Sequence, residues 1–263
     1  MNNTNNNIND NLNEGGILLI DKKQGISSFD IIRHIKRAFR EHYGGDKALN
    51  PLKKIGHSGT LDPIATGLVI ILLNKATKKA QEFLGYDKTY IAELLIGEAT
   101  DSYDTTGNII NKTELDEFYF DQNRNLENLT KAIESFKGEI MQEPPMYSAL
   151  KKNGVPLYEM ARQGISIERE KRKCNIYNIE ILKPPFYAAE KKGFKIELKV
   201  ACSKGTYIRS LCRDIGEKIG IPSVMSGLRR TSTGGFFVEN AIKFDEISLE
   251  KIINAVIKCQ KEE

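Results

Sequence analysis

This chain of 263 residues contains no tryptophan and little cysteine or histidine. The four cysteines are Cys174, Cys202, Cys212 and Cys259, and the three histidines are His34, His42 and His57. The cysteines form no Cys-x-x-Cys pair, so neither a zinc knuckle nor a disulfide framework is indicated. The histidines are too scattered to mark a metal cluster. We therefore expect reduced thiols, a cytoplasmic location and no bound metal.

Long apolar runs are also missing from the chain. No segment reaches the roughly 18 apolar residues that cross a membrane, and the polar N-terminus does not resemble a secretory leader, so we expect neither feature. Residues 1–14 are rich in asparagine and almost without apolar side chains. We expect a disordered tail there, because such a segment cannot bury enough surface to offset its ordering entropy.

The remaining composition is that of a globular protein. Hydrophobic residues make up 40% of the chain and charged residues 28%, which fits one large domain or two modest ones. The net charge of +4 is a mild basic excess that permits a polyanionic partner without demonstrating one.

The most informative stretch is residues 56–68, Gly-His-Ser-Gly-Thr-Leu-Asp-Pro-Ile-Ala-Thr-Gly-Leu. Its glycines permit backbone conformations that other residues avoid, and Pro63 biases Asp62 towards an extended backbone. Such a loop can direct one carboxylate outward, and the apolar run over residues 68–73 predicts a buried strand or helix beside it. By itself the stretch also has a plain structural interpretation, in which Asp62 caps a one-turn helix from Pro63 to Gly67.

The full wording of this stretch, closed by Lys75-Ala76-Thr77-Lys78, resembles the signature of the TruB family of tRNA pseudouridine synthases. So many ordered matches are far more specific than a lone glycine motif. In that family the aspartate of the motif is the nucleophile, so the resemblance implies that Asp62 is the catalytic residue here. It also implies that His57 occupies the place that the flipped base leaves and helps to hold the rearranged loop.

A second segment, Asp87-Lys88-Thr89-Tyr90, is similar to the family's Asp-Lys-x-Tyr. On that resemblance Tyr90 packs against the target base, and it is a candidate for helping to move the C5 proton. Considered without the family, Tyr90 would be an ordinary core aromatic in a strand predicted over residues 89–97.

A third segment, residues 204–211, reads Lys-Gly-Thr-Tyr-Ile-Arg-Ser-Leu and resembles the second strong signature of the family. The resemblance implies that Arg209 pairs with the nucleophile and that Tyr207 lines the uridine pocket. Leu228, within the Gly-Leu-Arg-Arg-Thr of residues 227–231, matches a family residue that closes the pocket. Without the resemblance, Leu228 would be a core residue and the two arginines after it a surface pair.

The resemblance runs from about residue 16 to residue 241 and implies the pseudouridine synthase fold, an α+β architecture with a central, mostly antiparallel mixed sheet flanked by helices. We expect a catalytic domain over residues 15–245, with a thumb-like insertion at about 140–175, and a C-terminal helix or tail over residues 246–263. Many family members continue into a small PUA-type RNA-binding domain, and too few residues follow here for a full one. The loop over residues 41–51 is longer than the family norm.

Local patterns predict the elements around these motifs. They indicate strands at residues 16–22 and 194–202, a helix capped by Ser27 or Ser28, a hairpin turn at 101–107, an amphipathic helix stopping at Gly138, a helix at 208–219 stopped by Gly220, and a helix-like pattern at 242–258.

These residues suit pseudouridine formation, which breaks the uridine N1–C1′ bond, turns the base and rejoins it through C5. An ionised aspartate can stabilise or trap the positive character that grows on the sugar. A guanidinium in contact with Asp62 would favour the charged form of that carboxylate. Attack at C1′, addition to the base at C6 and assisted elimination at the ribose are all compatible with the sequence, and an isomerisation needs no cofactor.

The main prediction is therefore an isomerase that flips a uridine out of the T-arm loop of tRNA, at the uridine-55 site, and acts as a monomer. One alternative is a non-catalytic RNA-binding or tRNA-folding module on the same scaffold. Another is a glycoside hydrolase that uses Asp62 with Asp101 or Asp104, which would require two carboxylates at a defined separation.

Overall fold

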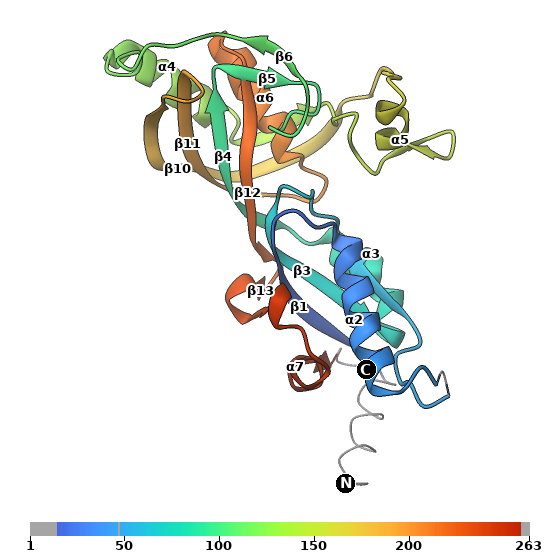
Figure 1. The fold of residues 1–263 in the computed structure, drawn as a ribbon. Coiled ribbons are helices and arrows are strands. Elements are labelled where there is room, and N and C mark those ends of the chain that lie inside the picture. The colour runs from blue at the N-terminus through green and yellow to red at the C-terminus, as the bar shows by residue number, and fades with distance from the viewer. Residues whose placement is uncertain (1–14, 47, 259–263) are drawn as a thin grey trace. The chain divides into compact units, whose positions relative to one another are not determined.

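A computed structural model describes residues 15–46 and 48–258, so the predicted asparagine-rich tail lies outside the described residues. The chain forms two compact units (Figure 1). Among the described residues, the first contains 15–46, 48–88 and 229–258, and the second contains 89–228. The first unit is therefore assembled from both ends of the chain, whereas the second is one continuous segment.

The first unit is built around two long apolar strands, β1 (Gly16–Lys22) and β3 (Thr66–Leu73). They pair antiparallel, with Gly16 opposite Leu73 and Lys22 opposite Gly67. The shorter strands that join them are β2 (Ile55–Ser58), β14 (Ile242–Lys243) and β15 (Ile257–Lys258). The strand β12 (Ser223–Thr233), whose last residues belong to this unit, runs parallel to β3, and β14 runs parallel to β1.

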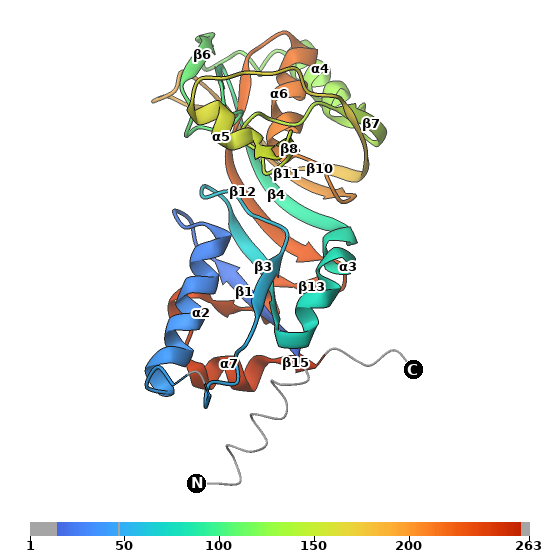
Figure 2. The same cartoon turned by 90° about the vertical axis from the view of Figure 1, so that its right-hand side faces the viewer.

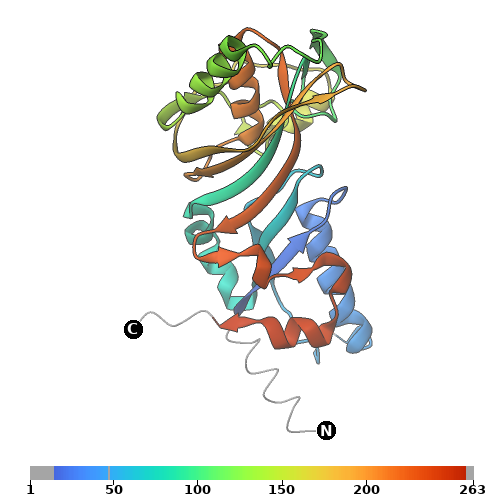
Figure 3. The same ribbon diagram turned by 90° about the vertical axis from the view of Figure 1, so that its left-hand side faces the viewer.

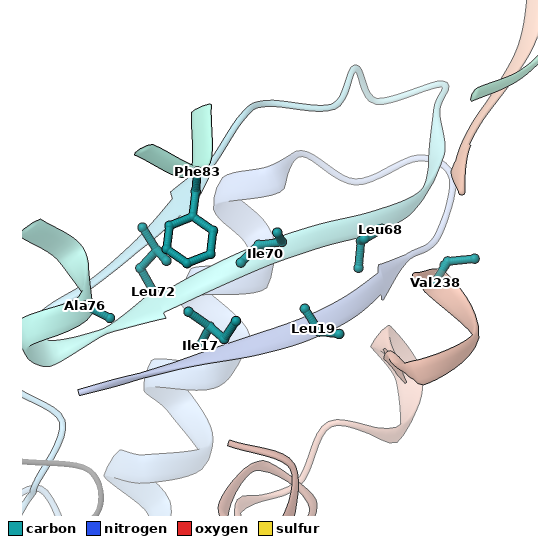
Figure 4. Close-up of a cluster of buried hydrophobic side chains, with 8 residues drawn as sticks. All are labelled: Ile17, Leu19, Leu68, Ile70, Leu72, Ala76, Phe83 and Val238. Atoms are coloured by element: carbon teal, nitrogen blue, oxygen red, sulfur yellow. The ribbon is translucent and has the colours of Figure 1, made fainter. Parts of the chain in front are cut away.

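The core of the first unit follows from the two-residue period of these strands. Alternate residues point to one face, where they meet side chains from the short helix α3 (Ala80–Gly85) and from the 3₁₀ segments η1 (Asn74–Lys79) and η2 (Val238–Asn240). Figure 4 shows this cluster, which consists of Ile17, Leu19, Leu68, Ile70, Leu72, Ala76, Phe83 and Val238. The helix α2 passes behind the same strands in that view.

Helix α2 (Ser28–His42) confirms the sequence prediction closely. Its N-cap is Ser27, and Ser27 and Asp30 form a reciprocal capping box that satisfies backbone donors at the helix start. The apolar stripe of the helix is buried, and it consists of Ile31, Ile32, Ile35 and Phe39. The first turn of the helix lies close to the loop that contains Asp62, because the Leu61 N–H donates to the hydroxyl of Ser28.

The second unit contains a sheet in the order β12, β4, β11, β10, β7. The strands that follow β12 in this order are β4 (Lys88–Ile96), β11 (Gly193–Cys202), β10 (Arg172–Ala188) and β7 (Gly138–Gln142). Helices α4 (Asn123–Glu134) and α6 (Ile208–Ile219) lie side by side in this unit (Figures 2 and 3). Gly220 ends α6 in the left-handed conformation, with φ of 75°, as predicted.

Smaller elements complete the second unit. The hairpin of β5 (Glu98–Thr100) and β6 (Ile109–Lys112) confirms the predicted turn over residues 101–107. The segment over residues 140–175, where we expected an insertion, contains the β8–β9 hairpin (Lys151–Lys152 and Val155–Pro156) and the short helix α5 (Leu157–Arg162).

The predicted architecture, a mixed and mostly antiparallel sheet with flanking helices, is confirmed, but two local predictions were wrong. Helix α4 ends at Glu134, after which the N–H groups of Phe136 and Lys137 donate to carbonyls only three residues earlier in the chain. Gly138 does not stop the helix but begins β7, with φ of 97°. The pattern over residues 242–258 is also not one helix. It divides into β14, the 3₁₀ turn η3 (Phe244–Glu246), α7 (Leu249–Ala255) capped by Ser248, and β15.

Across the described residues, the structure contains no helix of the length and apolar character needed to span a membrane.

Candidate active site

Asp62 lies in the loop that joins β2 to β3 within the first unit. The backbone N–H of Ala65 donates to the Asp62 carbonyl over 3.0 Å, which makes residues 62–65 a turn. No helix is assigned to these described residues, so the alternative of a capped one-turn helix is wrong. Asp62 is half-buried, and it belongs to this short, tight turn.

The loop begins and ends at glycines with positive φ, which are +86° at Gly59 and +103° at Gly67. A Cβ on Gly67 would stand 2.7 Å from the backbone nitrogen of Arg230, closer than real Cβ contacts. The cause is the parallel pairing that places Gly67 opposite Arg230 in β12. Gly67 is therefore required for two reasons, its backbone conformation and the close approach of β12.

Two hydrogen bonds to neighbouring segments hold the middle of the loop. The hydroxyl of Ser28 accepts from the Leu61 N–H over 2.9 Å, and the Gly25 N–H donates to the Pro63 carbonyl over 2.8 Å. Ser28 is only 1% exposed, so this contact is shielded from water. The positions on either side of Asp62 are thus tied to the start of helix α2 and to the turn that precedes it.

Lys22, the last residue of β1, is a buried cation below the same loop, with no exposed surface. Its ammonium donates to the carbonyls of Lys23 over 3.0 Å, Ile26 over 2.8 Å and Pro63 over 3.4 Å, which uses all three donors of the group. Burial lowers the pKa of Lys22 to about 8, and the Asp62 carboxylate opposes that change. A positive charge is therefore kept within electrostatic reach of the proposed nucleophile.

His57 lies on β2. Burial, and after it the Arg230 cation, lowers the pKa of His57 and so favours the neutral ring, whereas a bond with the Gly59 backbone opposes this shift. Its Nδ1 is buried and has no hydrogen-bond partner among the described residues. A neutral ring with an unused nitrogen suits the base-replacing role that the sequence suggested.

In the second unit, Arg209 stands in the first turn of α6, and its side chain is 5% exposed. Its guanidinium donates to the carbonyls of Ser102 over 3.1 Å and Tyr147 over 2.8 Å. Its Nε lies 3.8 Å from a carboxylate oxygen of Asp104, which is also buried. The arginine is therefore held in one orientation by two separate segments, the turn that contains Ser102 and Asp104 and the segment that contains Tyr147.

Asp104 is itself fixed, because its carboxylate accepts from the Ser102 hydroxyl over 3.0 Å and from the Thr106 N–H over 2.9 Å. The sequence suggested only a hairpin turn here, or an acid for a glycoside hydrolase. In the structure this acid forms an ion pair with Arg209.

The predicted pocket residues of the second unit occupy three elements. Tyr207 is the N-cap residue of α6, and its backbone N–H donates to Oε1 of the buried Gln142 over 2.7 Å. Tyr90 on β4 is 8% exposed, and Leu228 on the neighbouring strand β12 is half-buried. The structure therefore brings Tyr90 and Leu228 onto adjacent strands and Tyr207 and Arg209 onto one helix start.

Sequence reasoning missed two charged residues of these sites, Lys22 and Arg230, and it named Asp104 only as a possible acid of a glycoside hydrolase. The interpretation of Arg229–Arg230 as a surface pair was wrong, since Arg230 is 2% exposed and the Arg229 guanidinium binds both Asp21 oxygens, over 3.0 and 2.8 Å. A signal for Lys22 existed, because it shares its strand phase with the buried Leu18 and Ile20. Arg230 had no such signal, because its burial depends on pairing with a distant strand.

Residues 15–46 and 48–258 include no group of three or more His, Cys, Asp or Glu side chains placed to hold a metal ion.

Comparison with solved structures identifies the class of fold. The chain matches over 95% of its own length a protein chain in the crystal structure of a Cbf5–Nop10–Gar1 complex, with a TM-score of 0.64 and 26% identity, and it spans 62% of that chain. A chain in an H/ACA RNP bound to a substrate RNA containing 2′-deoxyuridine has the same fold, with a TM-score of 0.61 and 24% identity over 94% of this chain and 60% of that one. The architecture is the pseudouridine synthase fold.

Sequence comparison then identifies the family. Residues 47–208 match the N-terminal domain of TruB family pseudouridylate synthases, and residues 209–262 match the C-terminal domain of tRNA pseudouridylate synthase B. The tRNA pseudouridine synthase B of Clostridium tetani is 44% identical over 248 residues, which are 94% of this chain and 77% of that protein. The Lactobacillus acidophilus protein of the same name is 40% identical over 232 residues, 88% of this chain and 73% of that one. The chain belongs to the TruB family of pseudouridylate synthases.

Proposed function

We propose that this protein isomerises a uridine of tRNA to pseudouridine, at the uridine-55 site in the T-arm loop, with Asp62 as the nucleophile. The observation that carries the proposal is the Asp62 loop, a turn bounded by two positive-φ glycines and underlain by the buried Lys22 cation, in a member of this family. A fixed carboxylate beside a buried cation is suited to meet the positive character that develops on the ribose.

The other site residues have complementary roles in this proposal. Arg209, already oriented by Asp104 and two carbonyls, contacts the Asp62 carboxylate in the reacting complex and keeps it ionised. Tyr90, Tyr207 and Leu228 enclose the flipped base, whose extrusion from the stack requires a lining of aromatic and apolar groups. Tyr90 also assists transfer of the C5 proton.

His57 completes the machinery on the RNA side. Its neutral ring and unused buried nitrogen allow it to enter the space that the flipped uridine vacates and to bond the rearranged loop. We further infer that the enzyme works as a monomer in the cytoplasm on the T-arm stem-loop, where the mild basic excess of the chain, +4, assists contact with phosphates.

The test uses an unmodified tRNA transcript, the wild-type protein and Asp62→Asn. Site-specific detection of pseudouridine should show one modified T-loop uridine with the wild type, and a rate at least about 10³-fold lower with the variant. Because asparagine has the shape of aspartate, the affinity of the variant for tRNA should stay within a few-fold of the wild-type value.

A transcript with cytidine in place of the target uridine is the control for site choice. Binding of tRNA by both proteins without modification by either would reject the enzyme and favour the non-catalytic RNA-binding or tRNA-folding module. Equal activity of wild type and Asp62→Asn would reject the nucleophile alone.

A further inference from the structure

Arg230 is a fully buried arginine of β12 with direct bonds to the catalytic loop, all within the first unit. Its Nε donates to the Leu68 carbonyl over 2.7 Å, and one of its terminal nitrogens donates to the Gly59 carbonyl over 3.2 Å. Gly59 and Leu68 flank the turn that contains Asp62. One rigid guanidinium therefore connects the residue that begins the loop with the strand that follows it.

The two glycines of the loop are packed against the same arginine. A Cβ on Gly59 would lie 3.6 Å from a terminal nitrogen of Arg230, and a Cβ on Gly67 would collide with the Arg230 backbone. Arg230 therefore contacts the loop with its side chain at one end and with its main chain at the other. The planar fork of an arginine can bond two carbonyls in fixed directions at once, which the single ammonium of a lysine cannot do with the same geometry.

The charge of Arg230 also acts on the residues around Asp62. Burial is the main cause of the lowered pKa of Lys22 and of His57, and the Arg230 cation lowers both further. The groups that act electrostatically on Lys22 are Asp62, Arg230 and Asp30. Keeping a second cation buried close to Lys22 is costly, and the two bonds of the Arg230 guanidinium to the loop carbonyls offset part of that cost.

We propose that Arg230 is a positioning residue of the reaction: its guanidinium joins the two ends of the loop over residues 59–68 and so holds Asp62 in its attacking position. This inference rests on the proposed function for its kinetic consequences. Its structural consequence, a loop that opens when the guanidinium is lost, is independent of catalysis.

The first measurement is hydrogen exchange followed by mass spectrometry on wild type, Arg230→Met and Arg230→Lys. Methionine keeps the buried volume without the donors, and lysine keeps the charge with one bonding point. The Leu61 and Ala65 amides, which bond to Ser28 and Asp62, report on the loop. They should exchange at least about tenfold faster in Arg230→Met, with Arg230→Lys between this variant and the wild type, while helix α2 keeps its wild-type protection.

The second measurement is single-turnover and steady-state modification of tRNA. Displacement of a reacting group by about 1 Å lowers rates roughly 10²-fold, so kcat should fall by about that factor in Arg230→Met. Arg230→Lys should regain about tenfold of the loss. The KM for tRNA should stay within about twofold in both variants, because Arg230 is buried and makes no contact with the substrate in this proposal.

Ile252→Ala is the matched control, since Ile252 is a fully buried residue of α7 and its truncation destabilises the same unit without touching the loop. Loop exchange equal to wild type in Arg230→Met, or faster exchange spread evenly over the unit as in Ile252→Ala, would overturn the proposal. A raised KM with kcat retained would overturn it as well.

If Arg230→Met does not fold, the exchange pattern and kcat of Arg230→Lys decide. Absence of activity in the wild type would reject the proposed function instead, and the exchange data would still test the loop contact.

Discussion

Replacement of Gly67 by alanine tests the close approach of β3 and β12 beside the loop that contains Asp62. Gly67 has φ of +103°, which costs a non-glycine residue about 1–3 kcal/mol. Its added Cβ would also stand 2.7 Å from the Arg230 nitrogen, and overpacking of this kind costs about 1–3 kcal/mol. We expect Gly67→Ala to lower the free energy of unfolding by about 4 kcal/mol in total.

Gly25→Ala separates the two contributions. Gly25 has a similar φ of +85°, but a Cβ there would meet nothing within 4 Å. It therefore carries the backbone strain alone, reduced by the smaller entropy of the unfolded alanine chain, for a net loss of about 1 kcal/mol. Both variants are compared with wild type by urea unfolding and by thermal unfolding followed by circular dichroism.

The difference between the variants, about 3 kcal/mol, corresponds to a midpoint for Gly67→Ala that is about 6–12 °C below that of Gly25→Ala. The Asp62 loop should shift with the strand, so the rate of pseudouridine formation should fall in Gly67→Ala even below its melting temperature. Equal stabilities of the two alanine variants would refute the argument that contact with Arg230 makes the glycine obligatory.

Two further predictions concern buried charges. Lys22 has a pKa of about 8 in the folded protein against its ordinary value of 10.5, so the unfolded chain binds more protons between these pH values and stability rises with pH there. Between pH 7 and 10.5 the free energy of unfolding of the wild type should therefore rise by about 3 kcal/mol relative to that of Lys22→Met. Urea unfolding measures this difference, and a difference that stays constant with pH would contradict the prediction. Asp104→Asn removes the charge of a buried carboxylate that lies 3.8 Å from Arg209, and it should lower the free energy of unfolding by about 3 kcal/mol and also lower the single-turnover rate. The control is Asp121→Asn, which changes an exposed acid of the same unit, and equal behaviour of the two variants would show that the Arg209–Asp104 pair has no such role.

The fold could be predicted best where the pattern along the chain is local. The strand β1, the capped helix α2, the alternating strand β11 and the glycine-stopped helix α6 all follow from side-chain period and capping residues. The predictions failed where pairing with a distant segment determines the local structure. Helix α4 ends before its apolar pattern does, because Gly138 is used by β7, which pairs with β10.

The candidate site divides in the same way. The Asp62 loop was predictable because its motif is contiguous, and the start of α6 placed Arg209 and Tyr207 correctly at a strand-to-helix junction. The burial of Arg230 and the Asp104 contact of Arg209 could not be read locally, because each depends on residues more than 100 positions away in the chain. The pairing of Asp62 with Arg209 stays a prediction.

The division of the first unit between the two ends of the chain has a consequence for the order of events on the ribosome. Gly59 and its buried partner Arg230 are separated by 171 residues. At about 5–20 residues per second, the ribosome makes the loop some 10 to 30 s before it makes the arginine that spans it. The whole second unit is complete within that interval and can fold first. In the nascent chain, Asp62 and its loop should therefore exist well before the arginine that spans the loop, which is made only after the whole second unit.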